Sequence, residues 1–217
     1  MSRLRKPDEA DRVAFSKLSP EEKEQRRLYC YFWNHRFRHR SAAHAGRAYE
    51  RYVGYLYERK GYEVVYRGIE LGREDRGIDL VCLRGETLVV VQCKNWLHVP
   101  LTDREVAHLY GAVEVFYRIE APTIPGDLVA RMRPRPVIAT TGEVFHTARH
   151  FSRELQIRIA RVQMRPYPAI KCIAGSGKYH LPFHAHYDRT KVLPARGDCF
   201  VTTIAEARGR GFLPARY

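Results

Sequence analysis

The sequence lacks three features that would each assign it to a whole class of proteins. Its five cysteines form an odd set without a C-x-x-C pair, which argues against a disulfide framework. No stretch approaches the roughly 18 uninterrupted apolar residues of a membrane helix. The first residues, MSRLRKPDEADR, also lack the apolar core of a signal peptide. We therefore expect a protein of the reducing cytoplasm that has no membrane partner.

Acidic residues are scarce relative to basic ones. Lys and Arg total 38 against 24 Asp and Glu, which gives a formal net charge of +14. Such an excess favours a polyanionic partner, because each neutralised phosphate releases condensed counterions. A G+C-rich genome also favours Arg codons, so composition indicates a nucleic-acid partner without establishing it.

Local patterns divide the chain into three parts. Residues 1–43 form a basic segment with a helix that begins at Ser19-Pro20, where a serine N-cap precedes a proline at the first helical position. Residues 44–166 form the main domain. Pro166 and Pro168 mark its end, and residues 167–217 form a small module of different character.

The main domain alternates helical and strand patterns. Helices are expected at 44–60, 102–118 and 143–155, the first ending at Gly61 and the second beginning with a capping box. Strands are expected at 62–67, 77–83, 87–94, 135–141 and 157–164. This order favours a mixed α/β sheet that is covered by helices on both faces.

Polar residues end a strand that is otherwise apolar. In VVVQCK, Gln92 and Lys94 share one side of the strand, where two more hydrophobes are expected. A two-residue hairpin loop at Gly85-Glu86 pairs Asp79 with Gln92, and paired side chains share a face about 5 Å apart. Asp79, Gln92 and Lys94 would then meet at the mouth of the hairpin. The alternative is a partly exposed Asp79–Lys94 ion pair, which contributes about 0–1 kcal/mol.

A second carboxylate lies on the inward stripe of the preceding helix. Gly46, Glu50, Val53 and Tyr57 follow helical spacing, so Glu50 stands where a hydrophobe is expected.

Four segments, taken in order, resemble the catalytic domain of the Mrr-like branch of PD-(D/E)XK nucleases. They are GRAYE (46–50), DRGIDL (75–80), VQCK (91–94) and EVAHLYGA (105–112). The likeness continues through PVIATTG to IRIA and covers residues 44–165. It implies a restriction-endonuclease-like α/β core, with a mixed central sheet flanked by helices. It also implies metal-dependent hydrolysis of DNA in restriction, defence or DNA processing.

The resemblance implies a role for each polar residue. Asp79 corresponds to the central metal-binding aspartate, Glu50 to the first-helix glutamate and Lys94 to the lysine of the motif. Gln92 stands where most of the superfamily has Glu, so a metal site of Asp79, Glu50 and Gln92 carries less negative charge. The implied cofactor is Mg²⁺ or Mn²⁺.

Two other functions stay open on the sequence. One is a DNA-binding protein whose Gln-bearing site is inert, and the other is a junction-resolving nuclease. A homodimer would let two sites address two DNA strands. Further DNA contacts are expected from the following residues: Arg36, Arg38, Arg40, Trp96, His98, Arg189 and Lys191. Trp96 could instead support the end of the strand.

The C-terminal module, a small α+β unit, resembles the zinc-binding domain of Ada-type proteins, which is appended to some bacterial and phage nucleases. The stretches YHLP and EARGRGFLPAR carry the likeness. His184 stands where that domain usually has Cys, and its closing cysteines are absent. His180, His184 and His186, with Cys172 or Cys199, could bind zinc. The sequence favours a metal-free module that is stabilised by packing.

Overall fold

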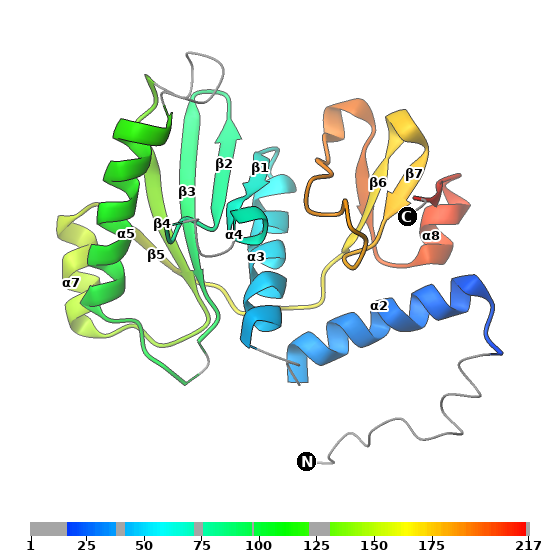
Figure 1. Cartoon of the computed structure of the whole chain (residues 1–217), viewed down its shortest axis with the longest axis horizontal. Coiled ribbons are helices and arrows are strands. Elements are labelled where there is room, and N and C mark those ends of the chain that lie inside the picture. The colour runs from blue at the N-terminus through cyan, green and yellow to red at the C-terminus, as the bar shows by residue number, and fades with distance from the viewer. Residues whose placement is uncertain (1–16, 38–41, 72–75, 97, 122–130, 216–217) are drawn as a thin grey trace.

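The fold is described from a computed structural model of the chain. The structure describes residues 17–37, 42–71, 76–96, 98–121 and 131–215. Of residues 30, 32–37, 42 and 71 it describes the backbone alone. These residues build two sheets, one of five strands and one of four (Figure 1).

The first sheet belongs to the main domain. Its helices are α3 (Ala42–Glu58), α4 (Arg67–Leu71), α5 (Asp103–Val115), the π-helix η2 (Phe116–Glu120) and α7 (His146–Glu154). Its strands are β1 (Glu63–Tyr66), β2 (Leu80–Arg84), β3 (Thr87–Lys94), β4 (Arg135–Thr140) and β5 (Arg158–Arg161). The strand order is β1-β2-β3-β4-β5, antiparallel from β1 to β3 and parallel from β3 to β5. The expected mixed α/β architecture is confirmed.

Local sequence signals explain where helix α2 (Pro20–Phe37) of the N-terminal segment begins and where α3 ends. Before α2, Ser19 accepts a hydrogen bond from the Glu22 N–H, and Glu22 accepts one from the Ser19 N–H. This reciprocal arrangement satisfies two free N–H groups at the helix start. Gly61 follows α3 with φ +80°, a left-handed conformation that glycine adopts without steric penalty.

Two apolar layers sandwich the sheet. Tyr49, Tyr52 and Val53 of α3 pack with Val89 and Val91 of β3 on one face. On the other face, residues of α5 and α7 pack with Leu88 and Val90. Successive residues of β3 therefore alternate between the α3 layer and the α5 layer.

The second sheet forms the C-terminal module. Its elements are β6 (Ile170–Ile173), η4 (Ala174–Ser176), β7 (Lys178–His180), η5 (Pro194–Arg196), β8 (Cys199–Val201), α8 (Ile204–Gly209) and β9 (Leu213–Pro214), with strand order β8-β6-β7-β9. Helix α2 runs beside this module (Figure 1), and its Leu28 is buried with Ile170, Leu181 and Ile204.

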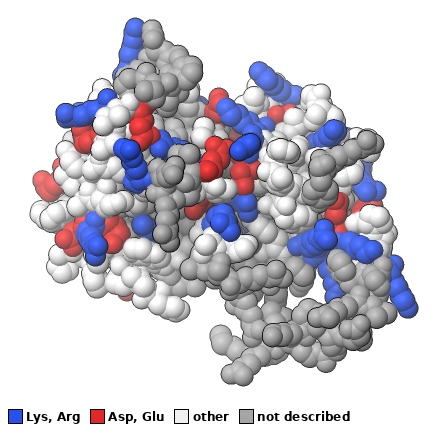
Figure 2. All heavy atoms as spheres, in the orientation of Figure 1, with Lys and Arg blue, Asp and Glu red and all other residues white. Residues whose placement is uncertain are grey.

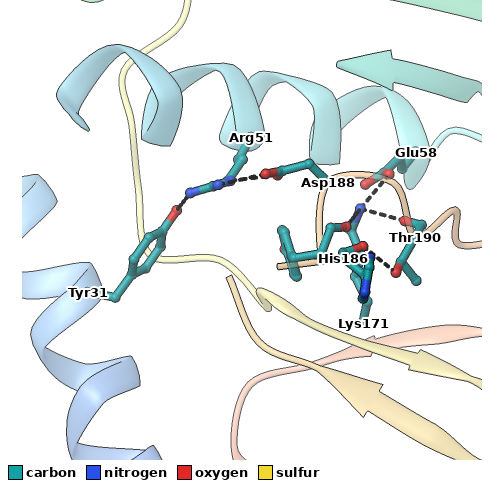
Figure 3. Close-up of polar contacts among 8 residues, drawn as sticks. Tyr31, Arg51, Glu58, Lys171, His186, Asp188 and Thr190 are labelled. Carbon is teal, nitrogen blue, oxygen red and sulfur yellow. Dashed lines mark hydrogen bonds and ion pairs between the residues drawn. The ribbon is translucent and has the colours of Figure 1, made fainter. Parts of the chain in front are cut away.

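Charged groups join the module to helix α3 (Figure 3). The ammonium of Lys171 is buried and donates to Glu58 at 3.1 Å and to the carbonyl oxygens of Thr190 and Tyr187 at 2.8 and 3.3 Å. Three acceptors thus satisfy its three N–H groups, which is what a buried ammonium requires.

Two features differ from the sequence-based expectation. The short helix α4 begins at Arg67, the last residue of the predicted strand 62–67, and no helix was predicted there. Strand β5 and helix α7 are shorter than the predicted ranges 157–164 and 143–155. Among the described residues, no helix has the length and apolar character needed to cross a membrane.

Candidate functional site

The β2–β3 hairpin has the predicted register. Leu83 pairs with Leu88 and Val81 with Val90, and the loop glycine Gly85 has φ +53°. The ladder begins at Leu80, so Asp79 lies just before it. The Asp79 N–H still donates to the Val91 carbonyl at 2.9 Å, and the Asp79 carboxylate accepts the Cys93 N–H at 2.5 Å. The Asp79 carboxylate thus accepts the Cys93 N–H, which a backbone carbonyl would accept if the β2–β3 ladder continued.

The alternation of side chains breaks at Asp79. Ile78 packs in the α5 layer and Leu80 in the α3 layer, although residues two apart in a regular strand share a face. Arg76 and Gly77, with φ +54° and +84°, turn the chain immediately before this point. The expectation that Asp79 shares a face with Gln92 is therefore not what the structure shows.

Asp79 instead meets Glu50. A Cβ atom added to Gly68 would lie 2.7 Å from Glu50 Oε2 and 2.8 Å from Asp79 Oδ1, so both carboxylates face the same small space beside Gly68. Helix α4 holds Gly68 there, because the Gly68 N–H donates to the Asp79 carbonyl at 3.0 Å. Arg67 fixes the same helix through an ion pair with Glu120 at 2.6 Å.

Gln92 lies on the other side of β3, and 2% of it is exposed. A Cβ atom added to Gly77 would lie 2.8 Å from Gln92 Nε2 and 2.6 Å from His108 Cε1, so Gln92 points toward His108 of α5. Its Oε1 atom is buried and accepts no hydrogen bond from the described residues. A buried acceptor without a partner is rare and destabilising.

Lys94 ends β3 on the same side as Gln92. Its ammonium lies 5.0 Å from the centre of the Trp96 ring, and Trp96 packs in the α5 layer. The pKa of Glu105 is lowered overall. Burial raises it, but hydrogen bonds from Thr102 and the nearby positive charge of Lys94 lower it by more. Lys94 therefore lies near the start of α5, and the Trp96 ring supports it.

The thiol of Cys93 lies on the α3 side of β3. Burial raises its pKa well above the usual value, the negative charges of Asp79 and Glu50 raise it further, and Lys94 lowers it. The end of β3 thus has two carboxylates toward α3 and α4, and an amide and an ammonium group toward α5.

The donor set fits a hard divalent cation. Mg²⁺ is typically held by one or two carboxylates together with waters and substrate phosphates. Glu50 and Asp79 supply two carboxylates beside Gly68. The space that they share is one that the Cβ atom of any other residue at position 68 would fill. Within the described ranges, no group of three or more His, Cys, Asp or Glu side chains is placed to hold a metal.

A comparison with known protein families shows which family the chain belongs to. The Mrr_cat family model, described as restriction endonuclease, matches residues 42–164, more than half of the chain. The chain belongs to the Mrr-type restriction endonuclease family. No curated protein and no solved structure matches it. The match contains Glu50, Asp79, Gln92 and Lys94, and it ends before the C-terminal module, so it gives no support to the Ada-type resemblance.

The residues predicted to contact DNA have different surroundings in the structure. Arg189 and Lys191 form ion pairs with Glu70 and Glu63, which join the C-terminal module to the Mrr-type domain. In the view of Figure 2, acidic side chains lie near the middle of the surface, and Lys and Arg side chains lie beside them. His98 is exposed. The side chains of Arg36, Arg38 and Arg40 lie outside the described part.

The strand register separates the candidate zinc ligands of the module. His180 pairs with Lys171, whereas Cys172 pairs with Tyr179 and with Cys199, so His180 and the two cysteines face opposite sides of the sheet. Burial and the nearby His180 lower the pKa of His184 to about 4. His186 is exposed.

Sequence reasoning missed a cationic hollow beside β5. It has a volume of about 620 Å³ and a floor of Val144, Ile157 and Ile159, and it is lined by three exposed arginines, Arg149, Arg153 and Arg161. No acidic side chain in the described part forms an ion pair with these arginines. The spacing of Arg149 and Arg153, four residues apart on one helix, was the available signal.

Proposed function

We propose that this protein is a metal-dependent DNA endonuclease. The proposal rests on the meeting of Glu50 and Asp79 at Gly68, beside the strand end that carries Lys94, in a domain of the Mrr-type family. Glu50 and Asp79 would hold a Mg²⁺ or Mn²⁺ ion. When bound, this ion supplies positive charge at the scissile phosphate and lowers the pKa of the attacking water.

The protein groups have separate roles in this proposal. The Cys93 N–H holds the Asp79 carboxylate, the Gly68 N–H of α4 holds the Asp79 carbonyl, and the missing side chain of Gly68 leaves space beside Glu50 and Asp79. Lys94, supported by Trp96, orients the attacking water or stabilises charge on the phosphate. Gln92 lies on the α5 side of β3 and is neutral, so Glu50 and Asp79 are the two charged ligands of the proposed site.

The arginine hollow supports a path for the DNA backbone. Lys94 pairs with Thr140, and Thr140 pairs with Arg161, so the three residues lie side by side across β3, β4 and β5. Since neighbouring strands are about 4.8 Å apart, Arg161 lies roughly 10 Å from Lys94 along this row. Arginine binds phosphate through two parallel hydrogen bonds. Arg149, Arg153 and Arg161 would therefore hold phosphates that flank the cleaved one.

Nicking of supercoiled plasmid tests the proposal. The wild-type protein should nick the plasmid with Mg²⁺ or Mn²⁺ and stop when chelator is added. Lys94→Ala and Asp79→Asn should each lower the rate on the order of 100-fold or more, and the asparagine keeps an oxygen that can accept the Cys93 N–H. Lys60→Ala, an exposed change at the hairpin end of the sheet, is the control. If Lys94→Ala nicks at the wild-type rate, the proposal is wrong.

One observation favours a second function, DNA binding without cleavage. Gln92 is neutral and points toward His108 instead of toward the two carboxylates. A gel-shift assay beside the plasmid assay separates the two, since binding without metal-dependent nicking supports the second function.

A further inference from the structure

Two cysteines of the C-terminal module lie directly opposite each other. Cys172 of β6 pairs with Cys199 of β8 in an antiparallel ladder, and both thiols are free. Residues paired in this way have Cα atoms about 4.5–5.5 Å apart, depending on the kind of pair. A disulfide requires a Cα separation of about 4.4–6.8 Å. The backbone therefore already has the spacing of a cross-strand disulfide.

The environments of the two thiols differ. Cys172 is fully buried, whereas Cys199 is half-buried and its sulfur lies 3.7 Å from a guanidinium nitrogen of Arg210. The Arg210 guanidinium also donates to Glu206 at 2.8 Å, which holds it beside the Cys199 sulfur, where it can stabilise negative charge on an attacking sulfur. Burial and the neighbouring Cys199 raise the pKa of the Cys172 thiol to about 12. The accessible sulfur is thus the reactive one, and the buried sulfur lies behind it.

We propose that Cys172 and Cys199 form a reversible disulfide on exposure to hydroperoxides. The Cys199 thiolate attacks the O–O bond, so its sulfur is oxidised to a sulfenic acid while the peroxide is reduced and leaves as hydroxide or alkoxide. The Cys172 sulfur then attacks the Cys199 sulfur. Its proton and the sulfenic hydroxyl leave as water, and the S–S bond forms. A dithiol reductant returns both thiols.

The bond would act on the segment that joins the module to the Mrr-type domain. The chain between Cys172 and Cys199 contains Asp188, which pairs with Arg51, and Thr190, whose carbonyl accepts from Lys171. Closing this loop restricts the unfolded chain and so stabilises the folded module. Oxidation would strengthen the attachment to α3, the helix that carries Glu50.

The test is oxidation of the full-length protein. Reduced protein is treated with a small excess of hydrogen peroxide, its remaining thiols are alkylated, and peptides are mapped by mass spectrometry without reduction. We expect a Cys172–Cys199 linkage with the loss of two hydrogen atoms, a midpoint of thermal unfolding higher by several degrees, and reversal of both by dithiothreitol. The proposal is overturned if Cys199 oxidises to sulfinic acid while Cys172 remains a free thiol.

Variants separate the proposed roles. With Cys172→Ser, Cys199 should progress to sulfinic acid because the second thiol is gone. With Cys199→Ser, the buried Cys172 should stay reduced, and Arg210→Gln should slow the linkage several-fold. Cys82 and Cys93 are internal controls that should remain free, because Cys82 pairs with Val64 and Val89 and Cys93 pairs with Ala139. Equal rates in wild type and Arg210→Gln would contradict the role of the guanidinium.

Discussion

Arg51 and Asp188 face each other across the boundary between the Mrr-type domain and the C-terminal module. Two guanidinium nitrogens of Arg51 donate to the two carboxylate oxygens of Asp188, each at 2.7 Å, and a third donates to the Tyr31 hydroxyl at 3.4 Å (Figure 3). The two charged side chains are 14% and 13% exposed. Because Arg51 directly follows Glu50 on α3, this contact fixes the helix turn that carries a proposed metal ligand.

Asp188→Ala should lower the free energy of unfolding by about 2–4 kcal/mol, because it leaves a largely buried guanidinium without its carboxylate partner. Urea denaturation measures this change. Lys191→Ala is the matched control, since Lys191 also pairs with the Mrr-type domain but lies in a pair that is 47% and 44% exposed. Its effect should stay below about 1 kcal/mol. Equal losses in the two variants would contradict the argument from burial.

The sequence predicted the sheet well because the relevant signals are local. The capping residues Ser19 and Thr102 mark helix starts, and Gly61 marks a helix end, through backbone chemistry within a few residues. The loop at Gly85-Glu86 sets the register of β2 and β3. The family match then confirms the relationship that four short segments predicted.

The arrangement of the site depends on contacts between distant segments and was only partly predictable. Strand alternation placed Asp79 with Gln92, but the turn at Arg76 and Gly77 and the bond to the Cys93 N–H direct Asp79 toward Glu50. The sequence after Arg67 shows no strand or helix pattern, so the position of Gly68 beside Glu50 and Asp79 was not predicted. The sequence also gave no register for β6 and β8, so the pairing of two distant cysteines could not be foreseen.

Gly68→Ala should damage the proposed site without changing any charged residue. Its methyl group would lie less than 3 Å from oxygens of Glu50 and Asp79, so both carboxylates must move. Small displacements of catalytic groups can lower rates on the order of 100-fold. We expect this loss in plasmid nicking, together with weaker Mn²⁺ binding by calorimetry. Gly111→Ala is the control, because nothing lies within 4 Å of an added Cβ there. Wild-type Mn²⁺ affinity in Gly68→Ala would argue against metal binding at this space.

Gln92→Glu tests whether the amide belongs to the metal site. A carboxylate at this buried position is destabilising without a cation, so thermal unfolding in chelator should occur at a lower temperature than in wild type. If the group reaches the metal, Mn²⁺ should restore the midpoint and bind on the order of tenfold more tightly, which corresponds to about 1.4 kcal/mol. Gln163→Glu adds the same charge at an exposed position at this end of the sheet. Destabilisation that Mn²⁺ does not relieve would place Gln92 outside the metal site.

Replacing Arg149, Arg153 and Arg161 together by Gln tests the proposed DNA path. Each phosphate contact contributes about 0.9 to the slope of log affinity against log salt concentration, so losing three contacts should reduce that slope by roughly 2–3. Affinity for a short duplex at moderate salt should fall at least roughly tenfold, as measured by fluorescence anisotropy in chelator, where no cleavage interferes. The control replaces Lys60, Arg133 and Arg135, which are exposed at the opposite end of the sheet, and removes the same total charge. A general effect of net charge would weaken both triple variants equally, whereas phosphate contacts beside Lys94 weaken only the first. The assay reports binding alone, so its outcome is independent of whether the protein cleaves DNA.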